Sequence, residues 1–340
     1  MKLVVFNIGR LGALQEDGSV IDLNLAYAAY AKSRGDERPY ARADASVPSD
    51  LLAFILEGEK GIQEAKKAVG HVKKGNALGP RGEKLLYKPD EVKLHAPLPS
   101  KGTKLAMAGA NFYDHSLDAG RSLRGDTTTT IDDLKRQVEK GEYPAWGFWK
   151  MAGCVVGPDA EVPYPSRTQR LDYEVEVGAV IGKRCKDVSE EDAAGCIYGY
   201  TIVNDLSIRD GGRRPGPDGF FYAKNFDGCA PMGPCIVTAD ELGDPYKLKL
   251  RQSVNGQVRQ DGSMGSIIRG FDWWLSYLTR DMVFYPGDVI CGGTCSGTAM
   301  DQTPLKDGKT DPRLFLKPGD QLEAWVEKIG SLRTRIVAKQ

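Results

Sequence analysis

The sequence predicts an α+β fold that is rich in β-strands, a sandwich, barrel or roll with a few helices, preceded by a small α/β domain. Two observations favour this fold. From about residue 91 onward the chain has many short β-type runs separated by glycine and proline, such as YEVEVGAVIG, YGYTIVND and GDVICGGT. Residues 1–90 instead combine one strand and turn with helical segments. We therefore expect a small N-terminal domain at 1–90 and a larger domain at 91–340.

The elements of the first 90 residues follow from local signals. A strand and turn around QEDGSVIDLN lead into an alanine-rich helix near Leu25–Ser33. A second helix is expected around Ser49–Val69, because Ser49 or Asp50 is a suitable N-cap. The glycine-containing polar segment KKGNALGPRGEK reads as a connector. No group of chemically reactive side chains gathers in this region.

The larger domain alternates strands with a few helices. Further strand-like runs are GCVVGP, GPCIVT and LKLRQSVNG. SEEDAAGCIYGY begins as a helix with Ser189 as N-cap and acidic residues in its first turn, and SMGSIIRGFDWWLSYLTR reads as another helix. A polar insertion near 119–146, containing TTTTIDDLKRQVEKGEYPAW, is also capable of forming a helix.

Composition excludes several classes of function. Lysine plus arginine and aspartate plus glutamate both number 46 among 340 residues, so no overall charge favours nucleic acid or an anionic membrane. The apolar runs are strand-sized, which predicts no membrane-spanning helix. The seven cysteines include no CxxC pair, and their odd number argues against a complete disulfide framework. We expect a soluble, reduced, cytoplasmic protein.

The stretch LDYEVEVGAVIG poses a physical problem. Residues two apart on a strand face the same side, so Asp172, Glu174 and Glu176 form a row of like charges. One explanation is a solvated strand face, although such a face usually mixes both signs. A glycosidase pair is a poorer explanation, because its carboxylates must flank a bond from opposite sides. A divalent metal ion would remove the repulsion, and Asp205, at the end of the strand-like YTIVND, offers a further ligand.

A longer comparison of motifs identifies a resemblance. RLDYEVEVGAVIGKRCKDVSEEDAAGCIYGYTIVNDLSIRD resembles the core motif of the fumarylacetoacetate hydrolase family, and the resemblance continues through AKNFDGCAPMGPCIVT, VNGQVRQDG, YPGDVICGGTCSGT and PGDQLEAWVEKIGSLRTRIV. It covers roughly residues 90–335. It implies that family's β-rich sandwich roll, a homodimer, and a site in which Glu174, Glu176 and Asp205 hold Mg²⁺ or Mn²⁺.

A base is expected in the segment GANFYDHSLDAG. His115 could be an ordinary surface histidine, but Asp118 lies three residues further on, so the two would share a face of a helix. A carboxylate at that position would fix the imidazole tautomer and raise its basicity. In the family the corresponding segment is a lid that brings a His–Glu pair to the substrate. This sequence has Asp118 where glutamate is expected.

The resemblance also implies residues that bind the substrate anion. Arg209 and Lys224 match positions that line the family's pocket, Lys224 as a catalytic cation, and Lys150 matches a lysine that precedes the metal strand. Gly293 and Thr294 match a loop that meets the substrate carboxylate, since glycine allows close approach of the backbone. Cys295 replaces that loop's proline. Each cation could alternatively be a surface charge.

These expectations together describe a metal-dependent enzyme acting on a small 2-oxo or β-diketo acid. The main hypothesis is hydrolysis of a C–C bond in an acylpyruvate or fumarylacetoacetate type of compound, as in the catabolism of aromatic compounds, with His115 activating water and the metal stabilising the enolate. The first alternative is an isomerase, decarboxylase or hydratase on the same site, because one fold can host several reactions. The second is a non-catalytic protein that binds metal and oxo acid.

Overall fold

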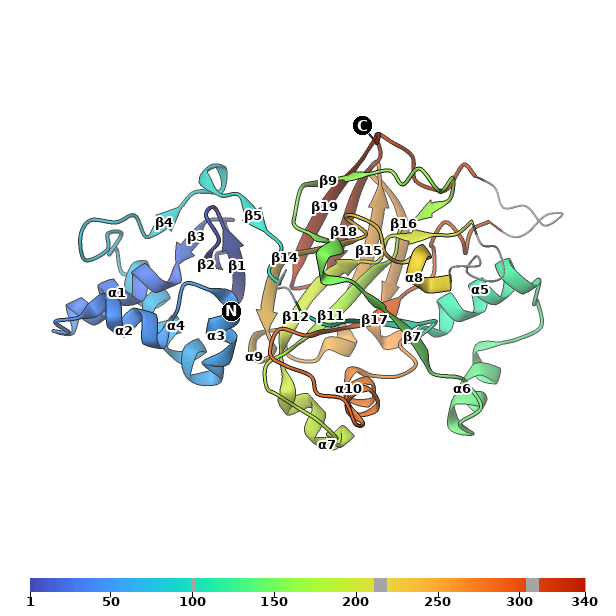
Figure 1. The fold of residues 1–340 in the computed structure, drawn as a ribbon, viewed down its shortest axis with the longest axis horizontal. Helices are drawn as coiled ribbons and strands as arrows, with labels where there is room; N and C mark the ends of the chain where they lie inside the picture. The colour runs from blue at the N-terminus through green and yellow to red at the C-terminus, as the bar shows by residue number, and fades with distance from the viewer. Residues whose placement is uncertain (99–101, 211–218, 304–311, 340) are drawn as a thin grey trace.

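The computed structural model describes residues 1–98, 102–210, 219–303 and 312–339, in a smaller N-terminal part and a larger C-terminal part (Figure 1). The N-terminal part starts with strands β1 (Lys2–Phe6), β2 (Arg10–Leu14) and β3 (Val20–Asp22). Helix α1 (Leu23–Ser33) follows directly, because the Asp22 carboxylate accepts a hydrogen bond from the Leu25 amide at 3.0 Å and caps the helix. Strands β4 (Leu86–Tyr87) and β5 (Leu94–His95) complete this part.

The expected single helix at Ser49–Val69 is two helices. Helix α3 (Leu51–Leu56) begins after Asp50, whose side chain accepts from the Ala53 amide at 2.8 Å. Helix α4 (Gly58–Lys73) starts again at Gly58, which has a positive φ of 57°. An α-helix cannot continue through a left-handed residue, so the prediction of one helix was wrong at this glycine. Helix α2 (Pro39–Ser46) was not predicted from the sequence.

Strands from both parts form one large sheet. Its order is β4-β3-β2-β1-β14-β12-β11-β17-β6-β7, and β1 pairs antiparallel with β14, placing Leu3 opposite Ile236. The strands of the larger part in this path are β6 (Leu105–Gly109), β7 (Trp146–Lys150), β11 (Val175–Ile181), β12 (Ile197–Asn204), β14 (Ala230–Thr238) and β17 (Val289–Thr294). The hydrogen bonds between β1 and β14 therefore join the two parts, on either side of the boundary expected near residue 90.

A second sheet packs on the first and forms a sandwich. Its order is β16-β15-β18-β19-β9, with bounds Gln257–Ser263, Lys249–Val254, Gln321–Val326, Gly330–Val337 and Ala160–Pro163. Val177 and Ile202 of the large sheet share a hydrophobic core with Leu250, Ala324 and Val326 of the second sheet. The short pairs β10 (Leu171–Asp172) with β13 (Ser207–Ile208), and β8 (Val155–Val156) with β14, complete the strands. The predicted β-rich α+β fold is confirmed.

Few helices accompany these sheets. Helix α7 (Glu190–Ala193) has Ser189 as its N-cap, as predicted, whereas the helix expected from Ser263 is restricted to α10 (Phe271–Thr279). The others are α8 (Gly219–Ala223) and α9 (Ala239–Leu242). The insertion near 119–146 contains the end of α5 (Tyr113–Arg124) and all of α6 (Ile131–Glu139), at the end of the molecule remote from the N-terminal part (Figure 1).

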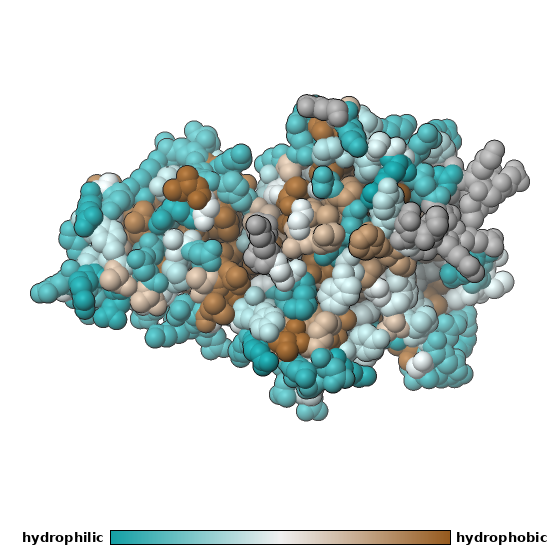
Figure 2. All heavy atoms as spheres, viewed as in Figure 1, coloured by the Kyte–Doolittle hydropathy of each residue, from teal (hydrophilic) through white to brown (hydrophobic). Residues whose placement is uncertain are grey.

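Hydrophilic residues cover most of the outer ends of the molecule, and hydrophobic ones show mainly toward the middle of the face seen in Figure 2. Within the described ranges, no helix combines the length and apolar character needed to cross a bilayer.

Candidate metal centre and active site

Three acidic side chains meet where β11 and β12 lie side by side. The strands pair antiparallel with Glu176 opposite Val203. Glu174, directly before β11, and Glu176, near its start, therefore lie beside Asp205, which follows the end of β12. One carboxylate oxygen of each acid lies within 4.8 Å of the other two, and all three side chains are buried. The solvated-face explanation is therefore wrong, because the row of acids faces the protein interior.

Two cations on the cavity wall contact this acidic cluster directly. Lys224 donates from Nζ to Oε2 of Glu174 at 2.6 Å and to Oδ2 of Asp205 at 2.7 Å. The Arg209 guanidinium donates to Oε1 of Glu174 and, at 3.1 Å, to Oδ2 of Asp172. The structure thus brings Arg209 and Lys224 to the site, where the sequence placed them.

The cluster has more negative than positive groups. Its buried carboxylates are those of Asp172, Glu174, Glu176, Asp205 and Asp301. The lysine and arginine cations that pair with them are Lys150, Arg209 and Lys224. If all of these ionise, two negative charges remain uncompensated in a buried region, which is unfavourable. A divalent cation carries the charge needed to balance them.

The pKa values of neighbouring groups respond to this excess charge. Burial, together with the charges of Asp205 and Glu174, raises the pKa of Glu176 well above its usual range. Burial has the same effect on Glu174, but Arg209 and Lys224 outweigh it and hold the pKa of that carboxyl well below its usual range. Burial would lower the pKa of His115, whereas Asp301 and Glu174 raise it to about 9. A proton on Glu176 and a proton on His115 offset the same two charges.

The donor set fits a hard divalent cation. Mg²⁺ and Mn²⁺ prefer oxygen ligands, and this cluster offers three carboxylates. Oδ1 of Asp205 is buried and forms an ion pair with Nζ of Lys150 at 2.9 Å, which leaves its second lone pair free. An oxygen with a free lone pair, beside two further carboxylates, could hold a metal ion. Oxygen-rich sites of this kind accept both ions.

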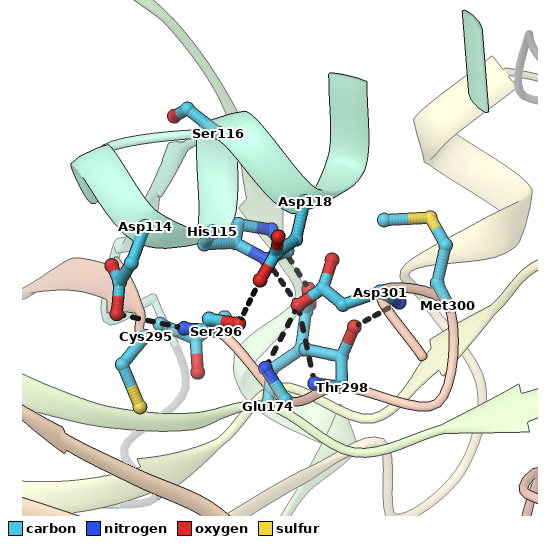
Figure 3. Close-up of polar contacts among 12 residues, drawn as sticks. Asp114, His115, Ser116, Asp118, Glu174, Cys295, Ser296, Thr298, Met300 and Asp301 are labelled. Atoms are coloured by element: carbon cyan, nitrogen blue, oxygen red, sulfur yellow. Dashed lines mark hydrogen bonds and ion pairs between the residues drawn. The ribbon is translucent and has the colours of Figure 1, made fainter. Parts of the chain in front are cut away.

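His115 projects from α5 toward the loop after β17 and pairs there with Asp301 (Figure 3). Its Nδ1 lies 2.8 Å from Oδ2 of Asp301, and its Nε2 lies 4.0 Å from Oε1 of Glu174. The imidazole therefore connects Asp301 with the acidic cluster.

Asp118 is not the partner of His115, which corrects the pairing expected from sequence. Asp118 does share a helix face with His115, but its carboxylate accepts from the Ser296 hydroxyl and from Nη1 of Arg121 at 3.0 Å (Figure 3). Asp301 lies on the facing loop, and its carboxylate is the one that contacts the imidazole. Asp118 instead attaches α5 to that loop, together with Asp114, which accepts from the Ser296 amide at 3.2 Å.

Asp301 was missed by the sequence analysis. It lies seven residues after Thr294, outside the recognised loop motif. The amides of Gly297 and Thr298 donate to its Oδ2 at 3.1 and 3.2 Å, so the loop backbone fixes the carboxylate. No local pattern marks such an aspartate, because its partner is 186 residues away.

Lys150 lies behind the acidic cluster and outside the cavity wall. Its Nζ donates to the carbonyl oxygens of Leu206, Lys224 and Cys229 at 3.1, 2.8 and 2.9 Å, and its side chain is fully buried. The expected contact with substrate is therefore replaced by contacts with the backbone that carries Asp205 and Lys224. Lys150 is the last residue of β7, and its Nζ also lies 2.9 Å from Oδ1 of Asp205.

The two expected loop residues are close to the cluster but already have protein partners. The Gly293 amide donates to Oε2 of Glu176 at 2.9 Å, and its φ of +89° suits glycine. The Thr294 hydroxyl donates to the Val175 carbonyl at 2.8 Å. Thr294 lies on the cavity wall, whereas Gly293 orients Glu176.

A cavity of about 510 Å³ lies over the cluster. The residues that give this cavity a charged or polar end are His115, Glu174, Glu176, Asp205, Arg209, Lys224 and Thr294. The insertion near 119–146 borders the same cavity through Leu123, Leu134 and Tyr143. The arrangement places a histidine, two cations and an acidic cluster around one enclosed space, as acid–base chemistry on an anionic substrate requires.

Comparison with known proteins finds similar sequences and similar folds. Residues 104–337 match the family model described as "Fumarylacetoacetate (FAA) hydrolase C-terminal". Oxaloacetate tautomerase YisK of Bacillus subtilis is 33% identical over 292 residues, which cover 86% of this chain and 87% of that protein. Among solved structures, fumarylacetoacetate hydrolase from Exiguobacterium antarcticum has a TM-score of 0.70 and 26% identity, with both chains fully covered. Maleylpyruvate hydrolase from Sphingobium sp. SYK-6, solved with manganese(II) and pyruvate, has a TM-score of 0.69 at 21% identity over both full chains, which shows the shared fold.

Proposed function

This chain belongs to the fumarylacetoacetate hydrolase family, and from that premise we propose that it hydrolyses a C–C bond in an acylpyruvate-type 2,4-dioxo acid with the help of Mg²⁺ or Mn²⁺. The named relatives act on small 2-oxo acids, either as tautomerases or as hydrolases. The observation that carries the proposal is the His115–Asp301 pair, which faces the acidic cluster across one cavity.

Each residue of the cavity has a distinct task in this proposal. Glu174, Glu176 and Asp205 would hold the cation, which when bound supplies Lewis-acid polarisation of the 2-oxo group. Arg209 and Lys224 offer positive charge to the substrate carboxylate. They can do so because both line the cavity while remaining fixed by Glu174.

The proton transfers fall to His115. In its neutral form the imidazole accepts a proton from water, whose oxygen adds to the carbonyl carbon at position 4. The C3–C4 bond then breaks, its electron pair passes to C3, and the proton held by His115 returns to the three-carbon fragment. The products are a carboxylic acid and pyruvate. Asp301 keeps Nδ1 as the protonated nitrogen and so leaves Nε2, on the Glu174 side, as the base.

Keto–enol tautomerisation of a 2-oxo acid is the second candidate. The match to the Bacillus subtilis tautomerase favours it, because that relative covers most of this chain. This reaction needs His115 only to move a proton between C3 and the 2-oxo oxygen, so it uses the same side chains without an attacking water.

Proton and carbon NMR in D₂O separates the two candidates. Purified protein with Mg²⁺ or Mn²⁺ is incubated with acetylpyruvate or oxaloacetate, and again after chelation. Hydrolysis gives acetate and pyruvate from acetylpyruvate, whereas tautomerisation gives deuterium at C3 of an intact acid, faster than without enzyme. Loss of both signals after chelation and in His115→Gln is expected. If neither fragments nor accelerated exchange appear with either metal, the proposed function is wrong.

A further inference from the structure

The end of the cavity away from the acids is built from aromatic rings. Trp146 and Phe220 stack with ring centroids 5.1 Å apart at 26°, and Phe148 stacks on Phe220 at 5.4 Å and 14°. All three line the cavity, and Trp146 is 37% exposed despite its size. Large aromatic surfaces that remain accessible inside a cavity indicate a place for an apolar ligand group.

The backbone is shaped to present these rings. Trp146 and Phe148 are two apart on β7, so they project to the same face. Trp146 pairs with Gly109 of β6, where a Cβ atom would lie 2.4 Å from the indole ring. Glycine at this position is what allows the indole to lie flat over the strand. Phe220 comes from α8, on the other side of the stack.

The aromatic rings continue directly from the charged end of the cavity. Nζ of Lys224, which holds Glu174 and Asp205, lies 4.6 Å from the centroid of the Phe148 ring. A substrate whose carboxylate lies near Lys224 would therefore extend its other end along these rings.

Two polar side chains on the cavity wall already have partners. The Tyr143 hydroxyl donates to the Ala110 carbonyl at 2.9 Å and lies 2.8 Å from the Ser116 hydroxyl. The Asp126 carboxylate accepts from the amides and hydroxyls of Thr128 and Thr129.

The positive charges of the cavity are unevenly placed. Among the described residues that line it, the lysine and arginine side chains are Lys224 and Arg209, both bound to Glu174, and Arg124, which is exposed on the insertion. A carboxylate beside Trp146 and Phe220, past the Phe148 ring that Lys224 contacts, would lose its hydration without gaining a buried cation, and this is unfavourable.

We propose that Trp146, Phe148 and Phe220 form a subsite for a flat, uncharged tail, so that the substrate is a 2,4-dioxo acid with an aryl group on its acyl carbon, an aroylpyruvate. The inference rests on the proposed action on 2-oxo acids and specifies the substrate class. A cavity of about 510 Å³ is in the range that encloses ligands larger than a four-carbon acid such as oxaloacetate.

The first test measures binding without turnover. Isothermal titration calorimetry with Mg²⁺-loaded protein compares pyruvate with phenylpyruvate, which differ by one ring. Wild type is expected to bind phenylpyruvate about 10- to 100-fold more tightly, as burial of one aromatic group predicts. Phe220→Ala should reduce that ratio to below about threefold. Phe221→Ala is the matched control, because Phe221 is the next residue of α8 and is 75% exposed outside the cavity wall.

The second test compares kcat/KM for benzoylpyruvate, acetylpyruvate, fumarylpyruvate and oxaloacetate. Preference for benzoylpyruvate, reduced in Phe220→Ala and retained in Phe221→Ala, supports the subsite. Preference for fumarylpyruvate or oxaloacetate that is lost in Arg124→Gln would overturn it, because a distal carboxylate would then be recognised. Equal binding of pyruvate and phenylpyruvate would also overturn it. Turnover of no 2-oxo acid, with no binding of pyruvate, contradicts the proposed function itself.

Discussion

Nδ1 of His115, on helix α5, lies 2.8 Å from Oδ2 of Asp301, on the loop after β17. The same carboxylate oxygen accepts hydrogen bonds from the Gly297 and Thr298 amides, so the loop holds it while the helix brings the imidazole to it. The contact therefore joins helix α5 to the loop after β17, and it depends on both being in place. This makes the pair the most direct test of the proposed acid–base chemistry.

Asp301→Asn should lower kcat for the preferred substrate by about 10²- to 10⁴-fold, while KM changes little. The amide cannot stabilise an imidazolium and favours the wrong tautomer of His115. The measurement is steady-state kinetics with saturating Mg²⁺, accompanied by thermal unfolding to show that the variant folds.

Asp118→Asn is the matched control for that variant. Asp118 lies on the same helix face as His115 but bonds to Ser296 and Arg121, so its loss should reduce kcat far less. A larger loss in Asp118→Asn than in Asp301→Asn would restore the pairing expected from sequence.

Glu176→Gln should weaken metal binding yet stabilise the chelator-treated protein. Glutamine keeps an oxygen for the Gly293 amide, and it removes a carboxyl whose pKa is raised by burial and by the charges of Asp205 and Glu174. We expect at least tenfold weaker Mg²⁺ affinity by calorimetry and a higher midpoint of thermal unfolding at pH 7.

The stabilisation should depend on pH in a defined direction. A carboxyl whose pKa is raised in the folded state destabilises that state only at pH values where the same carboxyl is ionised in the unfolded chain. The difference in stability between Glu176→Gln and wild type should therefore disappear as the pH falls toward 4.5, the ordinary glutamate value. Glu191→Gln, at an exposed position of α7, is the control. Unchanged Mg²⁺ affinity in Glu176→Gln would remove this residue from the metal site.

Lys150→Met separates a structural lysine from a substrate-binding one. The substitution leaves three buried carbonyls and the Asp205 carboxylate without their shared cation, and breaking a buried pair of this kind costs about 3–5 kcal/mol. Urea unfolding should show this loss, whereas Lys247→Met, at a side chain that is 84% exposed, should change stability by less than about 0.5 kcal/mol. A stable Lys150→Met protein with a raised KM would instead favour the substrate contact predicted from sequence.

Sequence reasoning worked where the physics is local. The two-residue period of a strand puts Glu174 and Glu176 on one face, and the residues that follow β12 bring Asp205 to the same end of the sheet. The cap at Ser189 and the strand YEVEVGAVIG are likewise encoded within a few residues.

What was missed depends on contacts between distant segments. Asp301 has no local signature, because its role is defined by the imidazole that α5 brings to it. The stacked rings of Trp146 and Phe220 similarly come from separate elements. Lys150 was assigned to the substrate because a motif gives the position of a residue along the chain but does not show which side of the sheet its side chain enters.

The unfolding free energy of chelator-treated protein should fall between pH 6.5 and pH 9. His115 has its pKa raised from 6.5 to about 9, because Asp301 and Glu174 outweigh the effect of burial. A group whose pKa is raised in the folded state stabilises that state fully at pH values below its unfolded pKa. This stabilisation is lost as the pH rises through the folded pKa. The shift corresponds to about 3 kcal/mol at most.

Urea unfolding at half-unit steps of pH measures the slope. His115→Gln should reduce it, leaving the part that Glu176 contributes through its own raised pKa, while His71→Gln, in helix α4, should leave it unchanged. Saturating Mg²⁺ should also reduce the slope, since a nearby dication disfavours the imidazolium. A slope as steep in His115→Gln as in wild type would mean that His115 is not the group whose titration lowers the stability.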